Sequence, residues 1–280
     1  MRGSPMRVFA LLLDGLELDL VERWNLEGLK QVEYGRYEAP ISPTYGKPHT
    51  PSAWYSFITG KPPAEHGVDS WWTYGSFLDW IRMKPPLVWI KNKRKLFWRL
   101  GLKPRVVDKR DTGGTTIFDL VKPSIAVNVP TYNEPTEYHY ELSKALEKGV
   151  REYEKKIWEI HKRRVSQVFE KIGDEWKLFM AWFDIADLMG HLHLIKRPQK
   201  LRRVYQILDD LAQRLKGKVP DETLFLIVSD HGMTPSGDGV TGDHSLYGFY
   251  SINKNLEFFK PKKITDFFPY ILRITGTDTI

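Results

Sequence analysis

The sequence predicts an α/β fold in which helices cover both faces of a central, mainly parallel β-sheet. Four short, continuous apolar runs, at residues 8–13, 125–129, 178–183 and 224–228, are typical of strands buried in a parallel sheet. Stretches with helical periodicity lie between these runs, and such alternation is characteristic of doubly wound α/β domains. We therefore expect residues 1–280 to form a single domain of this class.

Two of the helices are predicted from the spacing of apolar side chains. Residues 137–172 carry apolar side chains near one helical face, from Leu142 to Ile172. Residues 199–215 show the same spacing and end before Gly217. Both helices lie between predicted strands, as a crossover connection requires.

The composition changes between about residues 69 and 112, where Trp, Lys, Arg and Pro are frequent and no period is evident. We interpret this segment as a small cap-like insertion over a site at the edge of the sheet. Within it, residues 89–105 mix basic and aromatic side chains, as surfaces that bind nucleic acids or lipids do. A solvated basic surface with aromatic residues packed beneath it is the commoner explanation of this pattern.

The composition also limits the chemistry. The formal net charge of +7 suits an anionic substrate, although basic surfaces also occur on nucleic-acid binders and thermostable proteins. Because the chain has no cysteine, any metal must be held by histidines and carboxylates.

The composition also suggests the kind of organism, because abundant Lys, Arg and Glu beside few Asn and Gln are typical of a thermophilic source. No apolar run reaches the roughly 18 residues of a membrane span, and the N-terminal run is too short for a secretory signal, so we expect a cytoplasmic protein.

Candidate metal ligands follow three of the four predicted strands or lie in a later loop. They are Asp14, Asp187, His191, Asp230, His231 and His244. Ligands of an open parallel sheet bind beyond the carboxyl ends of its strands, so we expect these side chains to meet. Each one alone could be a turn residue, an incidental helical pair or a satisfied loop histidine. Their occurrence together favours a metal site.

A helix start supplies a candidate nucleophile. Thr50 is predicted as the N-cap of a helix with Pro51 at its first position, and Gly60 is predicted to end that helix. Plain capping explains this pattern on its own. A helix N-terminus also attracts phosphate, and a bound divalent ion can ionise a hydroxyl that is otherwise inert. Thr50 is therefore our candidate nucleophile, with Ser52 as the fallback.

Six motifs occur in order along the chain: LLLDG, TPSAWYSFITGKPPAEHGV, AVNVP, DIADLMGH, VSDHGM and GDHSLYGFYS. In these motifs and their order the chain resembles the alkaline phosphatase superfamily, specifically its type I phosphodiesterase and nucleotide pyrophosphatase branch. The resemblance implies an alkaline phosphatase-like fold and a two-metal hydrolase of phosphoric esters, most simply a phosphodiesterase that forms a phospho-threonine intermediate.

The resemblance also implies how the ligands divide between two divalent ions. One site takes Asp14, Thr50, Asp230 and His231, and the other takes Asp187, His191 and His244. Three carboxylates and one alkoxide balance the charge of two divalent ions, which suits a small anionic phosphate ester as substrate. Oxygen and nitrogen ligands without sulfur favour zinc, with manganese as the alternative.

One position departs from the family's pattern, and several other functions stay open. Nucleotide pyrophosphatases of this branch carry a phosphate-binding Asn where this chain has Trp71, which argues against nucleotide pyrophosphatase activity. The segment 237–242 satisfies G-x-G-x-x-G, but it neither directly follows a strand nor opens a helix, so we reject a dinucleotide site. A phosphomonoesterase, a metal-dependent phosphomutase and a non-catalytic binder of nucleic acid or lipid surfaces are the alternatives. The sequence predicts no oligomeric state.

Overall fold

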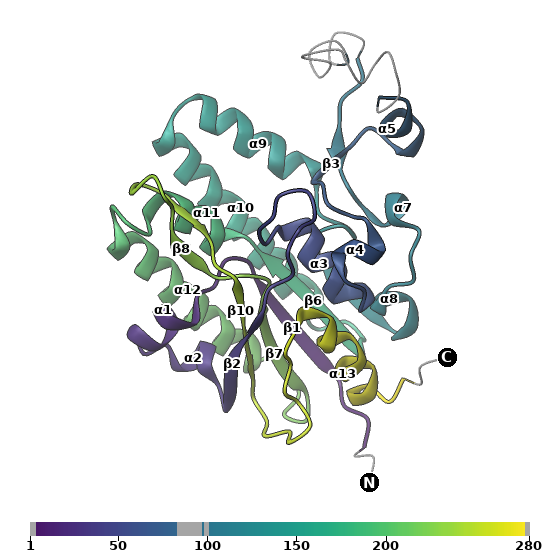
Figure 1. Ribbon diagram of the computed structural model, residues 1–280. Coiled ribbons are helices and arrows are strands. Elements are labelled where there is room, and N and C mark those ends of the chain that lie inside the picture. Colours follow the sequence, from purple (N-terminus) through teal and green to yellow (C-terminus); the bar gives the residue numbers. More distant parts are fainter. Residues whose placement is uncertain (1–3, 83–96, 98–100, 278–280) are drawn as a thin grey trace.

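The computed structural model describes residues 4–82, 97 and 101–277 of the chain. A six-stranded sheet forms its centre (Figure 1). In spatial order its strands are β2 (Glu33–Glu38), β10 (Tyr247–Ile252), β7 (Leu224–Ser229), β1 (Val8–Leu13), β6 (Leu178–Phe183) and β5 (Ser124–Val127). Strands β7, β1, β6 and β5 are parallel, whereas β10 is antiparallel to both β7 and β2. The prediction of a mainly parallel sheet is confirmed, and β10 and β2 add an edge that was not predicted.

The four predicted strands are all present. β1 and β6 have the predicted bounds, and β7 continues one residue further, to Ser229. β5 ends at Val127 instead of residue 129, because Asn128 has a φ of 55°, which no extended strand accommodates.

Helices cover both faces of the sheet (Figure 1). The first face is covered by α1 (Leu18–Arg23), α2 (Glu27–Lys30), α9 (Thr136–Glu147), α10 (Val150–Lys171), α11 (Ile185–His193) and α12 (Pro198–Lys216). The second face is covered by α3 (Thr50–Thr59), α8 (Ile117–Leu120) and α13 (Phe267–Ile274). Side chains of β1 alternate between the faces: Phe9 belongs to the first core cluster and Ala10 to the second. The predicted two-sided arrangement is confirmed.

The helix predicted over residues 137–172 is instead two helices, α9 and α10. The chain breaks at Gly149, whose φ of 110° lies outside the helical region. Leu146 and Val150, which flank the break, are 51% and 50% exposed, so they do not belong to the buried face that was predicted. The helix predicted over residues 199–215 corresponds to α12.

The predicted cap is described in part. The described part contains a small antiparallel strand pair, β3 (Trp72–Thr73) with β4 (Arg105–Val106). This pair contacts the start of α9, where Val106 N donates a hydrogen bond of 3.0 Å to Thr136 Oγ1. Most of the basic and aromatic stretch 89–105 lies outside the described residues, so its predicted role stays a prediction. The remaining short elements are α4 (Pro63–His66), α5 (Ser76–Arg82), α7 (Lys109–Thr112), β8 (Met233–Pro235), β9 (Gly242–His244) and the 3-10 helix η2 (Ile264–Asp266).

Over the part of the chain that the structure describes, no helix combines the length and apolar character needed to cross a bilayer.

Candidate metal centre

The candidate ligands converge beyond the carboxyl ends of the parallel strands. Asp14 follows β1, and Asp230 and His231 follow β7. Asp187 and His191 lie one turn apart on α11, which begins directly after β6. His244 ends β9, a strand that pairs with β8 in a hairpin after β7.

The first predicted ligand set comes together as one cluster. Ligand atoms of Asp14, Asp230 and His231 all lie within 4.8 Å of one another, and all three residues are buried. Oγ1 of Thr50 lies 3.5 Å from Asp14 Oδ1 and 3.4 Å from His231 Nε2. One detail of the prediction is wrong: His49 is the N-cap of α3, and Thr50 is the first residue of the helix.

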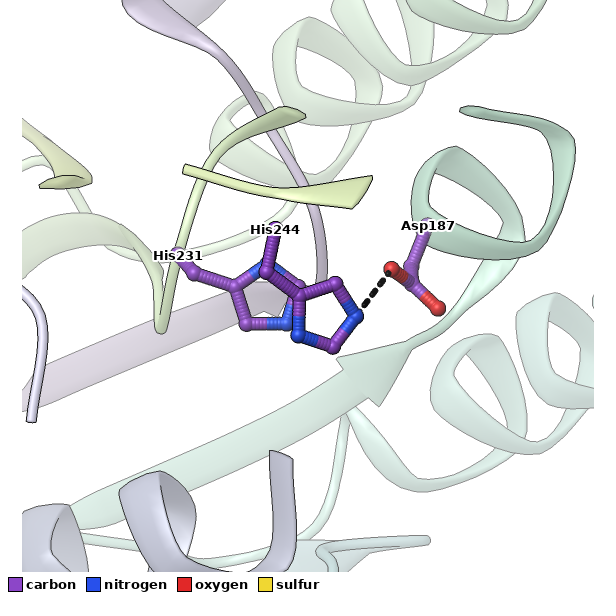
Figure 2. A group of neighbouring side chains, drawn as sticks. All are labelled: Asp187, His231 and His244. Atoms are coloured by element: carbon purple, nitrogen blue, oxygen red, sulfur yellow. Dashed lines mark ion pairs between the residues drawn. The ribbon is translucent and has the colours of Figure 1, made fainter. Parts of the chain in front are cut away.

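The second predicted set lies directly beside the first. Asp187 Oδ1 lies 3.5 Å from His244 Nε2. Figure 2 shows this ion pair, with His231 beside it. His191 Nε2 is 3.3 Å from Asp187 Oδ1 and 3.1 Å from His244 Nε2. The rings of His231 and His244 stack at 3.7 Å, so the two clusters share a boundary.

All three histidines are oriented in the same way. Nδ1 of His191 lies 2.7 Å from the carbonyl oxygen of Gly242, Nδ1 of His244 lies 2.8 Å from that of Pro48, and Nδ1 of His231 lies 3.0 Å from that of Gly232. A carbonyl oxygen only accepts hydrogen bonds, so we assign the proton to Nδ1 in each ring. The lone pair on Nε2 then faces the cluster, which is the arrangement of metal-binding histidines.

The carboxylates of the first cluster are destabilised by burial and by one another, and Asp230 lacks a hydrogen-bond partner among the described residues. Burial, together with the charge of Asp230, raises the pKa of Asp14 well above its usual range. Burial and the charge of Asp187 do the same to the pKa of Asp230. Both carboxylate oxygens of Asp230 are buried and have no hydrogen-bond partner among the described residues. A bound cation would supply the missing partner, so these residues fit a metal site.

In the second cluster, histidines compensate the charge of the buried carboxylate Asp187. Burial acts to raise the pKa of Asp187, but the hydrogen bond and charge of His191 and the charge of His244 outweigh burial and hold that pKa below its usual range. Burial acts to lower the pKa of His191, yet Asp187 raises it to about 9. A cation therefore competes with a proton at His191 Nε2, and we expect its binding to weaken in acid.

The fallback nucleophile does not face the site. Ser52 is fully buried, its Oγ has no hydrogen-bond partner among the described residues, and it does not line the cavity beside the clusters. Thr50 does line that cavity, which has a volume of about 400 Å³.

Most of the wall of this cavity was not predicted from the sequence, Trp71 excepted. Beyond the proposed ligands, its lining includes Trp71, His139, Tyr153 and Trp182. Trp182 is the second-last residue of β6, and residues at the carboxyl end of a parallel strand commonly lie near a binding site. His139 and Tyr153 come from α9 and α10, and no local signal connects them to the clusters.

A family profile described as Type I phosphodiesterase / nucleotide pyrophosphatase matches residues 8–247. The chain belongs to this family. The resemblance to this branch of the alkaline phosphatase superfamily is thereby confirmed. Human ectonucleotide pyrophosphatase / phosphodiesterase 5 shares the fold at 12% identity and a TM-score of 0.59, over 98% of this chain and 96% of that one.

Other known proteins match this chain over only part of their length. The murine ectonucleotide pyrophosphatase / phosphodiesterase 5 structure matches at 15% identity and a TM-score of 0.49, over 83% of this chain and 59% of that one. GPI ethanolamine phosphate transferase 3, catalytic subunit, is 34% identical over 64 residues in Homo sapiens and 33% identical over 66 residues in Mus musculus. These segments cover 23% and 24% of this chain and 6% of each transferase. The chain thus matches only a small part of the curated relatives.

Proposed function

We propose that the protein hydrolyses phosphodiesters with two divalent ions and a covalent phospho-threonine at Thr50. The observation that carries the proposal is the common orientation of three histidines, whose Nε2 atoms face the buried carboxylates of the two clusters. Among these carboxylates, Asp230 has no hydrogen-bond partner among the described residues. When bound, two divalent ions would lower the pKa of the Thr50 hydroxyl and offset the negative charge of the phosphoryl group. Zinc suits the nitrogen and oxygen ligands best, with manganese as the alternative.

The chain's own residues define the steps. Thr50 Oγ1 loses its proton to solvent and attacks phosphorus, and the bond from phosphorus to the departing ester oxygen breaks. That oxygen takes up a proton from solvent and leaves as an alcohol. Water then attacks phosphorus, the bond to Thr50 Oγ1 breaks, and one proton of the water returns to Thr50, so the products are the alcohol and a phosphate monoester. The start of α3 supports this role, because free N–H groups at a helix N-terminus attract the phosphate oxygens.

The substrate preference and the nucleophile are tested together. The wild type is expected to hydrolyse bis-p-nitrophenyl phosphate faster than p-nitrophenyl phosphate with zinc or manganese, and to lose this activity with a chelator. Thr50→Ala is expected to lower kcat by at least about a thousandfold while zinc still binds. Thr59→Ala, at the other end of the same helix, is the matched control. Unchanged turnover in Thr50→Ala would move the role to Ser52 or to water, and preference for the monoester would make the protein a phosphomonoesterase.

A second candidate is transfer to an alcohol in place of water. It is favoured by the 34% identity over 64 residues to GPI ethanolamine phosphate transferase 3. The same phospho-threonine would then react with an alcohol hydroxyl, and a new diester would form. Adding glycerol to the assay distinguishes the two, because transfer releases p-nitrophenol and yields a glycerol diester that phosphorus NMR detects.

A further inference from the structure

The cavity beside the clusters has an apolar and aromatic wall. Trp71 lies just before β3, Trp182 near the end of β6, and Tyr153 on α10. Leu142 and Leu188 complete the wall from α9 and α11. These side chains come from five separate segments, yet all of them border the space next to Thr50.

Trp71 is held in place by its neighbours. Its ring centroid is 4.8 Å from that of His139 and 6.1 Å from that of Trp182. His139 Nε2 lies 3.2 Å from Glu134 Oε1, and Arg164 binds the same carboxylate through two bonds of 2.7 and 3.0 Å. A ring that is fixed in this way loses little conformational entropy when a ligand stacks on it.

Trp182 adds a second fixed ring to the wall. Its side chain is almost fully buried. Arg164 lies over one face of the ring, with Cζ 4.6 Å from the centroid. These contacts hold the Trp182 ring in place beside Trp71.

Outside the proposed ligands, the carboxylate that lines the cavity is Asp184, which already pairs with Arg164 at 3.1 Å. The polar lining also includes His49, His139 and Ser143. Among residues 4–82, 97 and 101–277, no lysine or arginine lines this cavity. A second phosphate would therefore lack a lysine or arginine partner in the described wall.

We infer that the substrate is a diester with a single phosphate and a flat, apolar ester group, which stacks on Trp71 beside Trp182. This inference rests on the proposed function and makes Trp71 its specificity-determining residue. A pyrophosphate diester would place its second phosphate against a described wall without lysine or arginine, where desolvation of the added charge opposes binding.

Binding without turnover tests the inference in the zinc-loaded Thr50→Ala variant by calorimetry. Bis-p-nitrophenyl phosphate is expected to bind at least about tenfold more tightly than ADP-ribose, a pyrophosphate diester. Adding Trp71→Asn is expected to weaken aryl-diester binding about tenfold, which corresponds to a stacking contribution of about 1.4 kcal/mol. Trp71→Phe, which keeps an aromatic ring, is the matched control and should retain most of the affinity.

Three results would each overturn the inference. The first is equal affinity for bis-p-nitrophenyl phosphate and ADP-ribose, and the second is an unchanged affinity in Trp71→Asn. The third uses methyl p-nitrophenyl phosphate, which should bind less tightly than the bis-aryl diester: equal binding of these two also rejects the inference. Wild-type turnover of any diester is measured separately. Its absence defeats the proposed function, whereas turnover without the Trp71 effect defeats only the inference.

Discussion

Asp230→Asn should stabilise the metal-free protein and abolish its stabilisation by zinc. Asp230 is fully buried, and neither carboxylate oxygen has a hydrogen-bond partner among the described residues. It also lies in one cluster with the buried carboxylate of Asp14. An amide at this position removes one of two repelling charges, and its N–H group can donate to Asp14.

The size of the effect follows from burial. An uncompensated buried charge lowers the free energy of unfolding by several kcal/mol. The amide in Asp230→Asn still lacks some hydrogen-bond partners, so this variant should regain only part of this free energy, about 2 kcal/mol. In a chain of this size, 1 kcal/mol shifts Tm by roughly 2–4 °C, so the metal-free variant should melt roughly 4–8 °C above the metal-free wild type. Zinc at a hundred times its Kd should stabilise the wild type by about 2.7 kcal/mol and the variant hardly at all.

Differential scanning calorimetry with chelator and with zinc measures both effects. Asp210→Asn, which removes the same charge from an exposed position on α12, is the control. Burial raises the pKa of Asp230 in the folded state, so the folded carboxyl binds a proton more readily than the unfolded one. The stability that the metal-free wild type loses by burying the Asp230 charge therefore becomes smaller as pH falls toward the unfolded pKa. The difference in Tm between Asp230→Asn and the wild type should become smaller in acid as well. A metal-free variant that melts below the wild type, or that keeps the zinc shift, would refute the reasoning.

Three further predictions concern residues around the centre. Arg164→Met leaves Glu134 and Asp184 buried without their cation, so the free energy of unfolding in urea should fall by about 3–5 kcal/mol, and an unchanged midpoint would contradict this. Burial lowers the pKa of His161 to about 4, below its unfolded value of 6.5. The unfolded chain therefore binds a proton more readily, and the free energy of unfolding falls by up to about 3 kcal/mol as pH drops from 6.5 to about 4. His161→Phe should flatten this part of a curve of stability against pH. Gly15→Ala should lower Tm and weaken zinc binding in a calorimetric titration, because φ is 73° and the new Cβ would lie 2.6 Å from backbone of α11; full zinc affinity would argue against this contact.

The parallel core and the candidate ligands were predictable because both depend on local signals. Each central strand is buried on both faces, so it reads as a continuous apolar run, as in β1 and β6. The ends of such strands lie at one edge, so Asp14 and Asp230 could be expected to meet before any contact was known.

The remaining features depend on tertiary structure. β2 alternates between half-buried and exposed residues and carries charges, so its sequence lacks the signature of a buried strand. Gly149 breaks a helix whose charge and apolar spacing continue on both sides. The cavity wall combines Trp71, Tyr153 and Trp182, which are far apart in the chain, and no periodicity relates such positions.

The position of β1 in the middle of the sheet has a consequence for synthesis on the ribosome. β1 lies between β6 and β7, where Val8 pairs with Leu178 and with Leu224. β1 therefore emerges from the ribosome long before either of these neighbours, and contacts of such high sequence separation form slowly. Until His244 has left the exit tunnel, the candidate ligand clusters are incomplete. We expect the nascent chain to depend on chaperones that shield β1 during translation.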